Sequence, residues 1–120
     1  MKLYIDSSLT EACWVFENET PTRRVYKDWF VDVPTHNVGE YLAVEWALFD
    51  VLARGIPHVE AYTDSQLVVR QVSGEYKINL PHLKARAEHV RRLLQLTKST
   101  LSWVPREENL AGKELEKRKI

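Results

Sequence analysis

Disulfide bonds are excluded within this chain, because its 120 residues include one cysteine, Cys13. Small secreted domains usually depend on several disulfides, so a lone cysteine fits the reducing cytoplasm better than an oxidising compartment. The first ten residues also lack the apolar core of a signal peptide. From these two absences we expect a cytoplasmic protein, and nothing in the sequence indicates assembly beyond a monomer.

Long hydrophobic runs are missing too. The most apolar stretch, residues 41–53, is interrupted by Glu45 and Asp50 and is shorter than the roughly 20 residues that a membrane-spanning helix needs. Glycine is scarce, with four residues, and neither a Gly-x-Gly-x-x-Gly nor a Walker sequence occurs. We therefore expect no membrane segment and neither of these two phosphate-binding loops.

A surplus of positive charge is the third absence, because the formal net charge is zero. Proteins that bind nucleic-acid phosphates usually carry a basic surplus, so any such surface here must be local. Residues 82–98 offer one candidate, with five cations against the single acid Glu88; the alternative is an ordinary solvated helix face. The five cations are Lys84, Arg86, Arg91, Arg92 and Lys98.

The pattern of apolar residues predicts one mixed α/β domain over residues 1–120. Three strands joined by short turns form an antiparallel meander, and two later strands alternate with helices, which makes those strands parallel. The expected strands cover residues 2–6, 11–17, 23–33, 56–63 and 100–104. The expected helices cover residues 37–53, 65–73 and 80–97, with a short last helix capped by Asn109. The order is βββαβααβα, and the four tryptophans, Trp14, Trp29, Trp46 and Trp103, are expected in the core.

Three carboxylates stand at the ends of these elements. Asp6 ends the first strand, Asp64 ends the fourth, and Glu40 lies at the start of the first long helix, where Asn37 would cap it. Ligand chemistry in open α/β sheets gathers at the carboxyl ends of strands. Carboxylate oxygens are the ligands that Mg²⁺ prefers, so the three acids predict a divalent-metal site. The alternative for each acid is a plain capping or turn residue.

Four segments of the chain resemble the ribonuclease H family, in order and in spacing. They are Ile5-Asp6-Ser7-Ser8, Asn37-Val38-Gly39-Glu40-Tyr41-Leu42-Ala43, Thr63-Asp64-Ser65-Gln66 and Trp103-Val104-Pro105-Arg106-Glu107-Glu108-Asn109. The likeness covers nearly the whole chain and is greatest to the short, type 1-like bacterial and archaeal members. It implies a ribonuclease H-like fold, with a five-stranded sheet of three antiparallel and two parallel strands flanked by helices.

The resemblance also implies an activity, the metal-dependent endonucleolytic cleavage of the RNA strand of RNA–DNA hybrids. Asp6, Glu40 and Asp64 would be the catalytic metal ligands for two Mg²⁺ or Mn²⁺ ions, with Asp6 bridging them and the other two acids on the leaving-group side. Crowded carboxylates repel one another, so their pKa values should be raised without metal.

Substrate contacts follow from the same resemblance. His36, Asn37 and Gln66, with Ser65 beside them, match positions that touch the minor groove of the hybrid. Amides suit ribose 2′-hydroxyls because both groups donate and accept hydrogen bonds. Arg106 would contact phosphate, since the mobile histidine of some relatives has no counterpart between Arg106 and Asn109.

One departure from the family bears on activity. Active relatives carry a fourth carboxylate four residues after the asparagine of the last helix, and here that position is Lys113. The second metal should then be weakly held, unless the ammonium partly replaces its charge. Rescue by Glu108 or Glu114 is not expected, because residues one or five positions away project about 100° or more from the usual ligand.

Three functions therefore remain open. The first is the hybrid-cleaving endonuclease. The second is a catalytically weakened or inactive module that binds hybrid or RNA, which Lys113 motivates. The third is another nuclease on the same fold, such as an exonuclease or junction resolvase, because a fold does not determine a substrate. If position 113 faces the metals, Lys113→Asp should lower the Mg²⁺ requirement.

Overall fold

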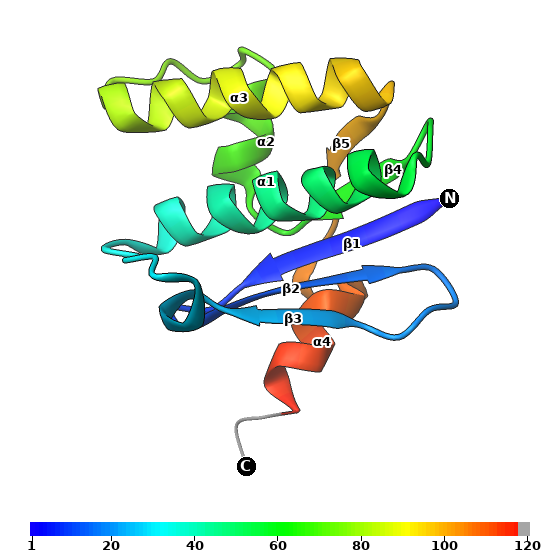
Figure 1. Ribbon diagram of the computed structural model, residues 1–120. Coiled ribbons are helices and arrows are strands. Elements are labelled where there is room, and N and C mark those ends of the chain that lie inside the picture. The colour runs from blue at the N-terminus through cyan, green and yellow to red at the C-terminus, as the bar shows by residue number, and fades with distance from the viewer. Residues whose placement is uncertain (118–120) are drawn as a thin grey trace.

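The computed structural model describes residues 1–117 and contains one mixed β-sheet (Figure 1). Within these residues the sheet has five strands in the spatial order β3-β2-β1-β4-β5. The strands are β1 (Lys2–Ser7), β2 (Glu11–Phe16), β3 (Thr22–Val25), β4 (Glu60–Thr63) and β5 (Thr100–Trp103). The first three strands pair antiparallel, while β1 with β4 and β4 with β5 are parallel. The predicted mixed sheet is confirmed.

Four α-helices and two short 3₁₀ helices complete the described residues, in the predicted order. The helices are α1 (His36–Arg54), α2 (Gln66–Val72), α3 (Pro81–Thr97) and α4 (Leu110–Glu116), with η1 (Tyr26–Trp29) and η2 (Arg106–Glu108). No helix within residues 1–117 is both long enough and apolar enough to span a membrane.

Helices cover both faces of the sheet, which Figure 1 shows as α1 and α3 on one side and α4 on the other. All six residues of β2 are buried, including Glu11. Trp14 and Phe16 belong to the larger core with α1, whereas Cys13 and Val15 pack with Ala111 of α4. The sheet is therefore a central layer, and the last helix lies directly against β1 and β2.

The predicted third strand over residues 23–33 is wrong beyond Val25. The chain turns into η1 there, and Phe30 ends that turn with a φ of 57° and a fully exposed side chain. Val25, Trp29 and Phe30 are residue types that strands favour, but η1 exposes Trp29 instead of burying it. Trp103 is also half-exposed, so the expected core position is wrong for these two tryptophans.

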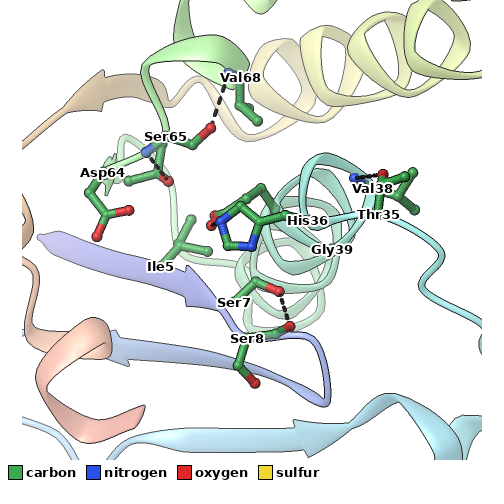
Figure 2. Close-up of polar contacts among 12 residues, drawn as sticks. Ile5, Ser7, Ser8, Thr35, His36, Val38, Gly39, Asp64, Ser65 and Val68 are labelled. Atoms are coloured by element: carbon green, nitrogen blue, oxygen red, sulfur yellow. Dashed lines mark hydrogen bonds and ion pairs between the residues drawn. The ribbon is translucent and has the colours of Figure 1, made fainter. Parts of the chain in front are cut away.

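The residue that caps helix α1 lies two positions before the predicted cap, Asn37. Thr35 has an extended backbone, and its side-chain oxygen accepts a hydrogen bond from the Val38 N–H (Figure 2). Threonine is a favourable cap when its backbone is extended, much as asparagine is. Asn37 is consequently an exposed first-turn residue rather than the cap. The longer helix places His36 four residues before Glu40, and therefore on the same face.

The basic stretch on α3 partly serves the fold. Arg86 pairs with Glu45 of α1, with Nη1 3.2 Å from Oε2. Arg91 donates to the carbonyl oxygens of Gln71 and Val72 at the end of α2. Two of the five predicted cations therefore join helices, which weakens the case for one continuous nucleic-acid surface there.

Candidate metal centre

Two parallel strands bring the aspartates together. The register pairs Ile5 of β1 with Thr63 of β4. Asp6 and Asp64, each one residue further on, therefore lie side by side toward the carboxyl ends of these two strands. Glu40, one turn into α1, faces them from above the sheet. The three side chains offer ligand oxygens that all lie within 4.8 Å of one another. The structure therefore brings together the three acids that the sequence pattern predicted as ligands.

Glu40 is buried without a full set of partners. Its side chain is 3% exposed, and Oε1 lies 2.9 Å from Nε2 of His36. Among the buried side-chain nitrogen and oxygen atoms of residues 1–117, Oε2 of Glu40 is the one without a hydrogen-bond partner. An unpartnered buried oxygen costs roughly 1–3 kcal/mol. Oε2 of Glu40 is therefore available to bind a ligand that is not part of the protein.

Burial and mutual repulsion raise the pKa of two of the acids. Burial raises the pKa of Glu40 to about 9, with the charges of Asp6 and Asp64 adding to it and Arg106 opposing. Burial also raises the pKa of Asp6 to about 6, with Asp64 adding to it. The predicted rise is confirmed for these two groups. Each therefore holds its proton more tightly in the fold than in water.

Asn109, at the start of α4, holds the strand that carries Asp6 and the side chain of Asp64 in place. Its buried Nδ2 donates to the carbonyl oxygen of Ile5 at 2.9 Å and to Oδ2 of Asp64 at 3.3 Å. Its Oδ1 accepts from the Ala111 N–H, which confirms the predicted cap of α4. One side chain thereby connects β1, Asp64 and α4. The sequence indicated the cap but held no sign of the contact with Asp64.

A recess opens beside Glu40 and Asp64, and most of the predicted substrate residues line it. These residues are His36, Ser65, Gln66 and Arg106, joined by Leu67 and Trp103. In Figure 2 the His36 ring lies to the right of Asp64 and above Ser7. Ser65 also caps α2 by accepting from Val68 at 3.3 Å. Asn37 is exposed and, within the described residues, lies outside this lining.

Trp103 is a recess residue, although its apolar character predicted a place in the core. Its indole Nε1 donates to the Asp64 carbonyl oxygen at 3.2 Å, and the ring is 44% exposed. Its place at the carboxyl end of β5, next to β4, was the available signal.

A second recess lies on the other side of Asp6, next to α4. Besides Asp6 it is lined by Ser7, Ser8, Leu9, His36, Arg106, Gly112, Leu115 and Glu116. Gly112 faces the aspartate so closely that a Cβ there would lie 3.0 Å from Oδ2 of Asp6. Lys113, at the family's fourth acidic position, is exposed. Oε1 of Glu114 lies 2.8 Å from Nζ of Lys117, and Glu108 is exposed.

The donor set suits a hard divalent cation. Three carboxylates converge, one oxygen is unpartnered, and no lysine or arginine among residues 1–117 forms an ion pair with any of these three acids. Buried carboxylates are normally paired with a cation or with a metal ion. Oxygen ligands of this kind are those of Mg²⁺ and Mn²⁺.

Comparisons with known proteins agree with this geometry. The model of the family described as reverse transcriptase-like matches residues 5–118. A segment of 76 residues, 62% of this chain, is 34% identical to the bifunctional protein Rv2228c of Mycobacterium tuberculosis. That segment spans 21% of Rv2228c, about a fifth of its length.

Solved structures share the fold over most of their length. RNase H1 of the archaeon Halobacterium salinarum is 25% identical, with a TM-score of 0.78, over 95% of this chain and 92% of that one. LC11-RNase H1, isolated from compost and solved in complex with an RNA/DNA hybrid, is 25% identical with a TM-score of 0.77. Its alignment covers 95% of this chain and 91% of that chain.

The N-terminal RNase H domain of Rv2228c matches in fold, with 23% identity and a TM-score of 0.76 over 95% of this chain and 93% of that chain. The family match covers almost the whole chain, and the sheet order and acidic cluster accord with it. This chain therefore belongs to the ribonuclease H family.

Proposed function

We propose that this protein is a metal-dependent endonuclease that cleaves the RNA strand of RNA–DNA hybrids. The observation that carries the proposal is the convergence of Asp6, Glu40 and Asp64 around an unpartnered carboxylate oxygen. A structural neighbour in complex with an RNA/DNA hybrid supports the substrate class.

Asp6, Glu40 and Asp64 would hold Mg²⁺ or Mn²⁺, two ions in all with the second weakly held. When bound, such ions lower the pKa of an attacking water and stabilise the negative leaving oxygen. Near neutral pH the carboxyl group of Glu40 must first give up the proton that its raised pKa retains, so binding releases a proton to solvent.

The side chains of the recess would position the hybrid. Arg106 is 70% exposed at the rim, where its guanidinium can donate two parallel hydrogen bonds to a phosphate. Gln66 and Ser65, at the start of α2, would meet ribose hydroxyls, and Asn37 would extend that contact along the groove. His36 lies between the recess and Glu40, so it would orient the carboxylate as well as contact the strand.

Incubation of the pure protein with labelled RNA–DNA hybrid, duplex DNA and duplex RNA, in Mg²⁺ and then in Mn²⁺, tests the proposal. We expect internal cleavage of the RNA strand of the hybrid alone. Absence of hybrid cleavage in both metals would refute it, and cleavage of another duplex would identify a different nuclease.

Lys113 at the fourth acidic position favours a second candidate, a module that binds hybrid or RNA without turnover. This candidate predicts a dissociation constant that Asp64→Asn leaves unchanged and no cleavage in either metal. The endonuclease instead predicts that Asp64→Asn abolishes cleavage.

A further inference from the structure

The last helix presents a glutamate that no sequence motif singles out. Gly112 faces Asp6, and Glu116 stands one helical turn later on the same face of α4. Residues four apart on a helix have Cβ atoms about 5–6 Å apart and project in nearly the same direction. Glu116 accordingly lines the recess that Asp6, His36 and Arg106 also line.

A further contact places Glu116 beside the acidic cluster. Its Oε1 lies 3.9 Å from Nε of Arg106, which sits at the rim of both recesses. Glu116 is therefore held at the opening of the recess that Asp6 also lines.

The cluster itself indicates that a ligand belongs at its centre. Glu40 is almost fully buried, and its Oε2 has no partner although the ligand oxygens of Asp6 and Asp64 lie within 4.8 Å. Gly112 leaves no side chain between α4 and Asp6, so the Asp6 side of the cluster stays open toward Glu116.

We infer that Glu116 takes the role of the missing fourth carboxylate and supplies an oxygen, directly or through a bound water, to a divalent cation on the Asp6 side. The inference rests on the proposed metal-dependent function and assigns a residue to it. Lys113 then points to solvent, and Arg106 holds Glu116 at the rim until the cation draws it inward. The chain thus keeps four acids by moving one of them along α4.

Mn²⁺ binding to the full chain tests the assignment without relying on activity. Titration calorimetry and electron paramagnetic resonance would count bound Mn²⁺, with and without a hybrid whose RNA strand carries non-cleavable 2′-O-methyl groups. We expect Glu116→Gln to weaken the weaker Mn²⁺ site about tenfold or more while the tighter site is unchanged.

Glu114→Gln is the matched control, because it makes the same charge change on α4 at a residue paired with Lys117 on the surface. We expect it to bind Mn²⁺ as the wild type does. Circular dichroism should show both variants folded, since the Glu116 side chain is 58% exposed. A crystal soaked in Mn²⁺ should show the weaker ion's anomalous peak next to Glu116 in the wild type and lose it in Glu116→Gln.

The outcomes separate the inference from the function on which it rests. A wild type that cleaves hybrid, with Mn²⁺ affinities that Glu116→Gln leaves unchanged, would overturn the role of Glu116 alone. A wild type that neither cleaves hybrid nor binds Mn²⁺ would overturn the proposed function, and the inference with it.

Discussion

Helix α1 buries two glutamates five residues apart, in opposite surroundings. Glu45 is 7% exposed in its side chain and is paired with Arg86 at 3.2 Å, with His89 at 3.8 Å. The Glu40 side chain is 3% exposed. One of its carboxylate oxygens contacts His36, and the other has no hydrogen-bond partner. Arg86 and His89 partly offset the cost of burying Glu45, whereas Asp6 and Asp64 add to the cost at Glu40.

The paired Glu45 therefore serves the fold, whereas Glu40 is suited to bind a ligand. A paired buried carboxylate joins two helices, and losing its partner destabilises the protein. An unpaired carboxylate among like charges destabilises the metal-free protein and becomes favourable once a cation binds. Substitutions in and around the two sites test this contrast.

The largest expected effect is on catalysis. Asp6→Asn should reduce hybrid cleavage by roughly 10³-fold or more, about 4 kcal/mol in barrier height, because a neutral amide is a poor ligand between two dications. The melting temperature should stay the same or rise, since one repulsive charge leaves the cluster. Cleavage rates and thermal melts measure both, with the exposed Asp28→Asn as control. Unfolding of Asp6→Asn alone would make Asp6 structural.

The second effect is on the pH dependence of metal-free stability. A carboxyl group whose pKa is raised by folding binds its proton more tightly when folded, so stability falls as pH rises between the two values. For Glu40 that window runs from 4.5 to about 9. We expect a loss of up to about 1.4 kcal/mol per pH unit within it.

Urea unfolding of the metal-free protein at pH 5 and pH 8.5 measures this slope. Glu40→Gln should flatten it and should be more stable than wild type at pH 8.5, while abolishing cleavage. Mn²⁺ should stabilise the wild type more at pH 8.5 than at pH 5, because the ion competes with protons. An identical slope in both proteins would show that Glu40 ionises freely.

The third effect comes from removing the arginine partner of Glu45, which leaves His89 as its neighbour. Arg86→Met keeps much of the aliphatic stem and removes the cation, so the free energy of unfolding should fall by roughly 1–3 kcal/mol. The effect is moderated because Arg86 is 30% exposed and the site is near solvent. Hybrid cleavage should stay within twofold at a temperature where the variant is folded.

Lys84→Met is the matched control for Arg86→Met, being an exposed cation on the same helix. Equal stability losses in the two variants would mean that the loss comes from the surface charge of α3 rather than from the pair with Glu45.

The smallest effect is expected at Lys113. The sequence predicted that Lys113→Asp lowers the Mg²⁺ requirement if this position faces the metals. The side chain is exposed and Gly112 faces Asp6 instead, so we expect less than a threefold change in the Mg²⁺ needed for half-maximal cleavage. Cleavage rates measured over a range of Mg²⁺ concentrations test this expectation. A large gain in rate in Lys113→Asp would show that position 113 supplies the fourth ligand.

The sequence was most informative where a rule of topology applied. Ligand chemistry gathers at the carboxyl ends of strands, so the positions of Asp6 and Asp64 at two expected strand ends predicted that they meet, and the pairing of β1 with β4 brings them together. Residue preferences were misleading where the chain turns. Trp29 and Phe30 are residue types that strands favour, yet residues 26–30 form a 3₁₀ turn that ends with Phe30 in the left-handed region.

Glu116 could not be predicted for a different reason. Its proximity to Asp6 depends on how α4 is rotated about its own axis against the sheet, which no local pattern fixes. The one hint in the sequence was Gly112, since a residue without a side chain marks the face of a helix that lies closest to its neighbour. Counting four residues on from that glycine leads to Glu116.

Asn109 has a consequence for the order of events on the ribosome. Its Nδ2 contacts the carbonyl oxygen of Ile5 across 104 positions of sequence. Ile5, next to Asp6, is therefore synthesised 104 positions before the side chain that braces it. A growing chain can form the first hairpin and α1 early, but the acids reach their final spacing only after Asn109 has left the ribosome.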